Sequence, residues 1–495
     1  MVSKRKLCFL QYTSAISASM TSLGLASAVA WSSPALPYFH TQSNFTKTEI
    51  YWIVPLLSVG CALGFLLNPL IINRLGRKKS LLLYSVPQLL SWLLLIFSKN
   101  NIIIIYLGRI LAGIGYGAGA CALTFYLSEI GNRENRGIFM VLFKLTMSIG
   151  SFLTVLIGAY CSHNTLNIFL LMLPITFLVT FIFMPDSTYF LSQNQETEIR
   201  IDFLNGKNDF SKLEKLIQPN LKIQALEESE KRIETNLKTS DAWEQVETNL
   251  KNADNCKQME TNLKNKTEEH DENTSGLKKL FTIPSNRRAL LITIACAAQN
   301  VFSGYGITKY FAQNILTYDE SLLPAKDAVF LLAAISILSS ASSTFTIEKF
   351  KRRTLLLTLG CLASFSIGIV GVFFYLKTNM NIKNFDWLPL VGLVIFDFSL
   401  TNGNYNIYLI YQGELFPSDV KSVGITFTKV TLMFFTFTAS IVYQLLNDIF
   451  DISMIFGIFA TFCLFQTFVI YKIAPETKGK SLDEIQQLLR SKTRN

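Results

Sequence analysis

Charged residues are scarce in this chain. Aspartate, glutamate, lysine and arginine make up 16% of its 495 residues, whereas soluble globular domains carry roughly 25%. Apolar residues make up 50%. This composition excludes a disordered chain, a collagen-like repeat and an ordinary soluble enzyme. Twelve membrane helices of about 20 residues would need about 240 residues, which is close to the apolar half of the chain.

Residues that bind metals or build disulfide frameworks are also few. The chain has three histidines and eight cysteines, and no cysteine pair shows a CxxC or other metal-ligand spacing. No phosphate-binding P-loop, nucleophile elbow or zinc motif is found in the sequence. The sequence therefore predicts no metal, no cofactor and no enzymatic activity, and it gives no support to pumping driven by ATP.

Twelve apolar stretches are long enough to cross a bilayer. Because hydrocarbon offers no partner to backbone N–H and C=O groups, each stretch is expected to be helical. The predicted spans are 7–30, 51–72, 81–98, 102–126, 138–160, 166–184, 289–316, 329–347, 354–376, 387–411, 423–446 and 452–473. We expect an all-α polytopic membrane protein with two pseudo-symmetric bundles of six helices at 1–184 and 289–474, a cytoplasmic central loop at 185–288 and a cytoplasmic tail at 475–495.

The positive residues of the short loops fall mainly on one side of the predicted membrane. By the positive-inside rule, that side, which carries both termini, is cytoplasmic. The formal charge of +10 is therefore a topology signal, which indicates the lipid bilayer and no nucleic acid as a partner. The sequon Asn44-Phe45-Thr46 falls in the first outer loop, where a glycan can be added.

The central loop contains a short tandem repeat. Glu-Thr-Asn-Leu-Lys begins at Glu234, Glu247 and Glu260, with a period of 13 residues. Three short polar units cannot bury a core of their own. The role of the 234–266 repeat stays open, a docking role included, and the sequence identifies no partner protein.

The two halves carry matching landmarks at their predicted cytoplasmic ends. A basic loop follows the second helix of each half, an acid followed seven residues later by a base ends the fourth helix, and a Pro-acid pair ends the sixth. Such internal duplication is typical of transporters. We expect the charged landmarks to form ion pairs that gate the cytoplasmic side: Arg77, Glu129, Arg136, Arg352, Arg353, Glu414 and Lys421.

These landmarks resemble those of the sugar porter family of the major facilitator superfamily, and in particular its branch of insect facilitated trehalose transporters. The resemblance covers all twelve spans. It rests on Leu-Gly-Arg-Lys at 75–78, Gly-Arg at 108–109, the glycines and acid-base pair that follow, Pro-Asp-Ser at 185–187, Gly-Glu-Leu-Phe-Pro at 413–417 and Pro-Glu-Thr-Lys-Gly at 475–479. It implies a major facilitator fold, and passive alternating-access transport of a sugar through a central cavity.

The resemblance is weaker at the sugar-binding positions. Where the family has a glutamine in the fifth helix, this chain has Lys144, and the helix 7 motif retains only part of its amides. The aromatic gate that follows survives in part as Tyr310. The tenth helix has an asparagine-rich stretch in place of the family's Gly-Pro motif. The residues expected to bind the substrate are Gln299, Asn300, Tyr310, Asn402, Asn404, Asn406 and Lys144.

Several charged residues fall inside predicted spans, where each costs roughly 2.5–3.5 kcal/mol on insertion scales. Lys309 and Asp397 lie in the outer halves of spans 7 and 10, so we expect them to form an ion pair near the outer gate. Lys144 and Lys429 lie near the cytoplasmic ends of their spans, where snorkelling is a sufficient account.

Three functions remain open on the sequence alone. A uniporter for trehalose or a hexose at the plasma membrane comes first, because residues 7–38 lack the acid that the family's proton-linked members use. The second is a carrier of a non-sugar, anionic solute, which the excess of intramembrane bases motivates. The third is a transport-silent nutrient sensor, which the long central loop motivates.

Overall fold

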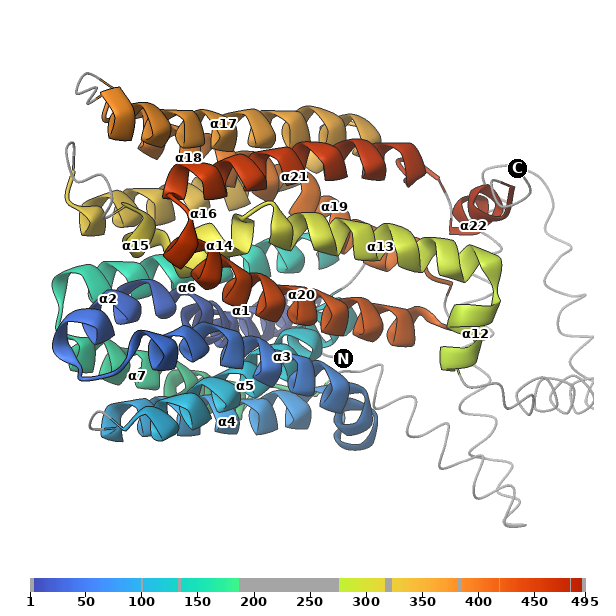
Figure 1. Ribbon diagram of the computed structural model, residues 1–495. Helices are drawn as coiled ribbons and strands as arrows, with labels where there is room; N and C mark the ends of the chain where they lie inside the picture. Colours follow the sequence, from blue (N-terminus) through green and yellow to red (C-terminus); the bar gives the residue numbers. More distant parts are fainter. Residues whose placement is uncertain are drawn as a thin grey trace, which may run out of the picture. The chain divides into compact units, whose positions relative to one another are not determined.

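The computed structural model describes residues 4–98, 101–131, 135–186, 276–316, 323–380, 385–417, 419–480 and 482–491. Helices dominate these ranges (Figure 1). The 13-residue repeat and residues 187–275 of the predicted central loop lie outside them.

The N-terminal half contains seven helices within the described ranges. Their bounds are α1 (Lys4–Ala30), α2 (Ser32–Gln42), α3 (Lys47–Leu75), α4 (Arg77–Phe97), α5 (Ile102–Ile130), α6 (Arg136–Tyr160) and α7 (His163–Phe181). The α1 helix ends at Ala30 and α2 begins at Ser32, with only Trp31 between them, so the two share one crossing. The six predicted spans are thus accounted for, with ends shifted by a few residues.

The described part of the C-terminal half contains six further crossings, two of them broken. The elements are α13 (Pro284–Phe302), α14 (Tyr305–Tyr310), α15 (Ala312–Leu316), α16 (Ala325–Lys349), α17 (Arg352–Met380), α18 (Leu388–Leu400), η1 (Thr401–Tyr405), α19 (Asn406–Glu414), α20 (Lys421–Ile449) and α21 (Ile452–Ile473). Two short helices lie outside the crossings, α12 (Gly276–Thr282) and α22 (Leu482–Ser491). The predicted tail is therefore partly helical, and Ile485 and Leu489 of α22 are buried against the bundle.

The fold is a twelve-helix membrane fold in two six-helix bundles. Among the described helices, nine are long and apolar enough to span a membrane by length and composition alone. The other three crossings do not meet these criteria of length and apolarity, for reasons visible in their sequences. The α1 helix is rich in serine and threonine, and the seventh and tenth crossings are each divided into short helices.

The two broken crossings have different local causes. The seventh crossing breaks at Gly304, whose φ of +89° is left-handed and strained for a residue with a Cβ. The tenth contains the π-helical turn η1, where the backbone carries one extra residue per turn. Both breaks face the interior of the bundle and are therefore candidates for functional positions.

Glycines bring α3 and α5 unusually close together. A Cβ placed on Gly113 would overlap the Leu57 carbonyl, and one on Gly117 would overlap the carbonyl of Cys61. Small residues allow this close backbone approach in membrane helices, where the hydrophobic effect does not draw helices together.

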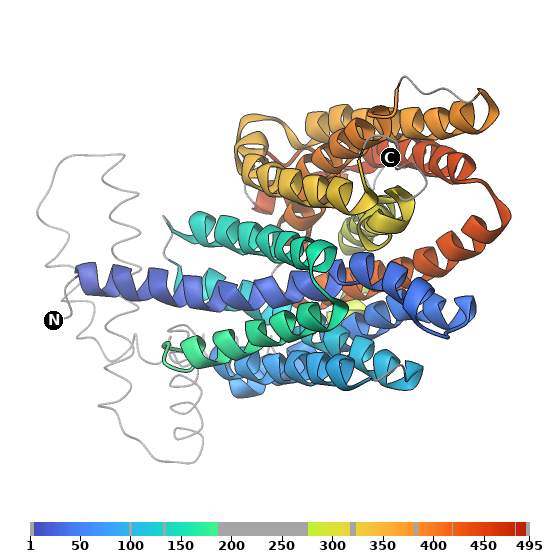
Figure 2. The ribbon, with the colours of Figure 1, turned by 90° about the vertical axis from the view of Figure 1, so that its left-hand side faces the viewer.

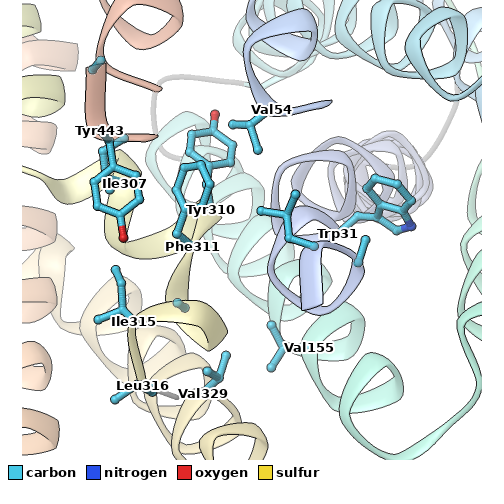
Figure 3. Packing of buried hydrophobic residues seen from close by; sticks show 14 of the residues in the cluster. Trp31, Val54, Val155, Ile307, Tyr310, Phe311, Ile315, Leu316, Val329 and Tyr443 are labelled. Carbon is cyan, nitrogen blue, oxygen red and sulfur yellow. The ribbon is translucent and has the colours of Figure 1, made fainter. Parts of the chain in front are cut away.

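The buried apolar clusters show where the two halves meet. One cluster contains residues of both halves, whereas a second lies in the C-terminal half and a third in the N-terminal half. Figure 3 shows part of the shared cluster, in which Val54 of the N-terminal half lies beside Tyr310 of the C-terminal half, while the Trp31 ring points away from Tyr310. The shared cluster lies toward the end of the helices opposite to the chain termini. Its members Ile50 and Val54, for example, lie near the start of α3, and Phe374 lies near the end of α17.

Candidate functional site

A cavity of about 300 Å³ lies between the two halves. Its walls come from α1, α2, α5 and α6 on one side and from the seventh, eighth, tenth and eleventh crossings on the other. Small-molecule sites span about 300–1,000 Å³, so this cavity fits a small solute. Figure 2, turned by 90° from Figure 1, shows α6 beside α16 of the C-terminal half. Where these two helices meet, they form one seam of the cavity.

Asn300 is an unsatisfied amide in the cavity wall. Its side chain is buried, and neither Oδ1 nor Nδ2 has a hydrogen-bond partner among the described residues. A buried amide without a partner is unfavourable by about 1–3 kcal/mol. Because Asn300 lines the cavity, a bound solute with hydroxyl groups can satisfy both of its atoms.

Lys309 and Asp397 face each other across the cavity wall. Lys309 Nζ lies 3.1 Å from Asp397 Oδ1, and Ser336 donates a hydrogen bond of 2.7 Å to Asp397 Oδ2. The Lys309 ammonium also lies 4.5 Å from the ring centroid of Tyr305. These contacts connect α14, α16 and α18, so the charges neutralise each other inside the C-terminal half.

Lys144 connects the two halves in the cavity. It projects from α6, and its Nζ donates a hydrogen bond to Asn406 Oδ1 of α19. One helical turn farther along α6, Ser148 and Ser340 hydroxyls lie 2.5 Å apart and make a second contact between the halves. Both contacts involve residues that line the cavity.

Three of the predicted substrate contacts lie outside the cavity wall. Gln299 Nε2 donates to Thr467 Oγ1 of α21 at 2.7 Å. Asn402 Nδ2 donates to backbone carbonyls of α16 and α18, and Asn404 Nδ2 donates to the Cys296 carbonyl of α13. These amides join helices within the C-terminal half, and the cavity wall instead contains Asn300, Tyr310, Asn406 and Lys144.

Sequence reasoning missed several polar residues of the wall. Tyr116, Tyr305, Ser336, Thr401 and Tyr405 line the cavity, and the Tyr305 and Thr401 hydroxyls lie 2.9 Å apart. The position of Tyr305, five residues before the predicted gate residue Tyr310, offered a weak signal for Tyr305. The serines of α16 gave none, because a serine is common in any membrane helix.

Arg109 is fully buried beside the cavity without being part of its wall. Its guanidinium donates to the carbonyls of Ile53 and Ala28 and to Ser32 Oγ at 2.8–3.1 Å. It also stacks on Trp31, with 4.9 Å between Cζ and the ring centroid. Arg109 therefore ties α5 to α1, α2 and α3.

The predicted gating residues lie at the end of the bundle that carries the termini. Arg77 Nη2 is 2.9 Å from Glu129 Oε1 in the N-terminal half. In the other half, the backbone N–H groups of Arg352 and Arg353 donate to the two carboxylate oxygens of Glu476 at 3.1 and 3.0 Å. Glu414 is half-buried, and Lys421 begins α20. The side chain of Arg136 is outside the described part of the structure.

Matching contacts recur at the helix ends of the two halves. The Tyr126 hydroxyl donates to the Pro185 carbonyl at 2.9 Å, and the Tyr411 hydroxyl donates to the Pro475 carbonyl at 3.0 Å. The backbone N–H of Lys78 donates to the carboxylate of Asp186. In the other half, the backbone N–H of Arg353 donates in the same way to the carboxylate of Glu476. The sequence duplication is thus repeated in the contacts.

Contacts between the two halves gather at the end opposite to the termini. There the Tyr51 hydroxyl donates to Asp448 at 2.6 Å and the Tyr160 hydroxyl donates to Asp327 at 2.6 Å. The Arg77–Glu129 ion pair and the backbone hydrogen bonds to Glu476 at the termini-bearing end join residues of the same half. Together with the buried apolar cluster that the two halves share, these contacts close the cavity on the side away from the termini.

Two six-helix bundles that enclose a central polar cavity and seal it at one end define a membrane carrier of the two-repeat class. The chain belongs to the Major Facilitator Superfamily, whose model matches residues 15–433.

Known proteins with similar sequences and folds agree with this assignment. The facilitated trehalose transporter Tret1 of Bombyx mori is 23% identical over 98% of this chain and 88% of that protein. Tret1 of Polypedilum vanderplanki is 24% identical over 98% of this chain and 89% of that protein. The xylose transporter XylE from E. coli, in an inward-open conformation, has a TM-score of 0.71 at 15% identity, covering 97% of this chain and 99% of XylE.

In the described part of the chain, no group of three or more histidine, cysteine, aspartate or glutamate side chains is placed to hold a metal ion. The polar groups of the cavity are amides, hydroxyls, the Lys309–Asp397 ion pair and the ammonium of Lys144.

Proposed function

We propose that this protein carries a sugar, a hexose or trehalose, across a membrane by facilitated diffusion with alternating access. The relatives named above are facilitated trehalose transporters and a xylose transporter. The observation that carries the proposal is the cavity between the halves, with the unsatisfied amide of Asn300 in its wall.

The direction in which the cavity opens follows from the charge pattern. The basic loops lie at the end of the bundle that carries the termini, so this end is cytoplasmic by the positive-inside rule. Because the opposite end is sealed by contacts between the halves, the described state faces the cytoplasm. Transport requires those outer contacts to break while the cytoplasmic ends of the halves approach.

The coupling mode we propose is uniport. Residues 7–38 contain no aspartate or glutamate, and the acid of the cavity wall, Asp397, is paired with Lys309. A paired carboxylate is a poor proton carrier, because protonation would leave the lysine without its counter-charge.

We further propose that the protein acts in the plasma membrane and carries a glycan on Asn44. This asparagine is exposed in the loop between α2 and α3, on the side we take as extracellular. Loss of an endoglycosidase-sensitive mobility shift in Asn44→Gln would support the site and the outer position of this loop.

Uptake into vesicles that contain the purified protein tests the function. We expect labelled glucose or trehalose to equilibrate across the vesicle membrane, without accumulation and without dependence on a pH gradient. Asn300→Ala should reduce uptake at least about tenfold, because the substrate loses a buried amide. Gln412→Ala is a matched control, since this buried amide donates to Thr428 within the C-terminal half and lies outside the cavity wall. A correctly folded protein that is silent toward both sugars would support the sensor reading instead.

A further inference from the structure

The charges in the cavity wall do not cancel. Among the described residues, the charged members of the wall are Lys144, Lys309 and Asp397. Lys309 and Asp397 form the ion pair described above. Lys144 takes part in none of the salt bridges of the described part of the chain. The wall therefore has one positive charge without a counter-charge.

The groups around Lys144 are arranged to receive one more ligand. Asn406 Nδ2 is held by the Thr401 carbonyl at 2.6 Å, which turns Oδ1 of the same amide toward Lys144. An ammonium has three N–H donors, and Asn406 accepts one. Ser148 and Ser340, a turn away, add hydroxyls to the same part of the wall.

A neutral sugar would leave this charge uncompensated. A cation inside a membrane protein is unfavourable unless it is paired or solvated. Hydroxyl groups can accept hydrogen bonds from Lys144 but supply no negative charge. A carboxylate supplies both, with charge-assisted hydrogen bonds that are roughly twice as strong as neutral ones.

We propose that the preferred substrate is a sugar acid, a polyol ring that carries one carboxylate, and that Lys144 is the residue that selects it. A single ammonium balances a single charge, which favours a carboxylate over a phosphate ester with its charge of about −1.5 to −2 at neutral pH. The ring hydroxyls would bind Asn300 and the tyrosines of the wall. This inference rests on the proposed function, since it specifies the cargo of the same cavity.

Glucuronate and glucose form a matched pair for the test, because they differ only in a carboxylate in place of a hydroxymethyl group. Equilibrium binding to the purified full-length protein is expected to be roughly tenfold or more tighter for glucuronate. Lys144→Gln should abolish that preference by weakening glucuronate about tenfold while changing glucose less than about threefold. Lys144→Arg should retain the preference. That result would show that position 144 tolerates substitution and that the preference depends on the positive charge.

Lys429→Gln is the control for a general effect of removing an intramembrane lysine. Its ammonium lies 3.3 Å from Cys121 Sγ, and it is outside the cavity wall. It should leave the glucuronate preference intact. Glucose 6-phosphate should bind more weakly than glucuronate.

The inference is overturned if the wild-type protein binds glucose as tightly as glucuronate, or if Lys144→Gln leaves their ratio unchanged. Vesicle uptake separates this failure from that of the proposed function. Uptake of glucose or trehalose without a glucuronate preference would overturn the sugar-acid inference alone. Absence of both binding and uptake for glucose, trehalose and glucuronate would overturn both.

Discussion

At the scale of residues, the Lys309–Asp397 pair yields a sharp prediction. Asp397→Asn removes the counter-charge and leaves the ammonium inside the cavity wall. Removing one partner of a fully buried ion pair lowers the free energy of unfolding by about 3–5 kcal/mol. Because 40% of the Lys309 side chain is exposed, we expect a smaller loss, about 1–3 kcal/mol, measured as a lower Tm of the purified protein and reduced sugar uptake.

The double variant Asp397→Asn with Lys309→Met is the control for that prediction. It removes both charges, so it should recover part of the stability and the uptake that the single variant loses. If the double variant performs no better than Asp397→Asn alone, the two residues do not act as a pair.

Glu476 connects the residue scale to pH. Burial, the largest single influence, raises the pKa of this carboxyl, but hydrogen bonds from the N–H groups of Arg353, Lys478 and Arg352 outweigh it, so the pKa falls below its ordinary 4.5. A lowered folded-state pKa stabilises the protein above pH 4.5, and this stabilisation is lost as the pH falls through the folded-state pKa.

Replacement of Glu476 should therefore change the pH dependence of stability. Glu476→Gln is expected to lower the Tm near neutral pH and to differ progressively less from the wild-type protein as the pH falls below 4.5. Thermal unfolding between pH 7 and pH 3 measures this. A Tm difference that stays constant over the whole range would contradict it.

The amides show how far sequence reasoning reached at this scale. The helix 7 stretch identified Gln299 and Asn300 equally, yet only Asn300 lines the cavity. Similarly, Asn402, Asn404 and Asn406 are indistinguishable in sequence. Their directions depend on the π-helical turn at Thr401–Tyr405, which rotates each side chain relative to a regular helix.

At the scale of elements, the contact between α3 and α5 makes a prediction about helix packing. Gly113→Ala should destabilise the protein by about 1–3 kcal/mol, because the new methyl group would meet the Leu57 carbonyl of the neighbouring backbone. Gly457→Ala in α21 is the matched control, since a Cβ there meets nothing within 4 Å. That change should be neutral or stabilising by up to about 1 kcal/mol.

Thermal unfolding of both variants in the same detergent compares them directly. Equal effects of the two alanines would show that helix propensity, and not the approach of α3 to α5, determines the outcome.

Most of the elements were predictable from apolarity and length. Ten crossings lie where the sequence predicts them, with ends shifted by a few residues. The breaks in the other two were not predicted. A left-handed glycine and a π-helical turn change the backbone locally without changing the apolar pattern, so stretches 289–316 and 387–411 look continuous in sequence.

At the scale of the whole molecule, the duplication predicts that equivalent substitutions have equivalent effects. Tyr126→Phe and Tyr411→Phe each remove a hydroxyl that donates to a proline carbonyl at a helix end. Each should destabilise the protein by about 1 kcal/mol, with little effect on substrate affinity, since neither residue lines the cavity. A large loss of affinity in one variant only would contradict this equivalence.

The account as a whole depends on two halves that expose one cavity alternately. Distances between spin labels at both ends of the bundle test this most directly. Thr41 and Asn379 are exposed near the sealed end in opposite halves, and Asn73 and Lys349 are exposed near the termini-bearing end. Cysteines at each pair, on a background without the native cysteines, can be labelled and measured with and without sugar.

Substrate should shift the two distance distributions in opposite directions. The account predicts a population in which Thr41 and Asn379 move apart while Asn73 and Lys349 approach, because the outer contacts of Tyr51 and Tyr160 break as the cytoplasmic ends close. Distances that stay fixed, or that lengthen or shorten together, in a protein that binds the sugar would contradict alternating access.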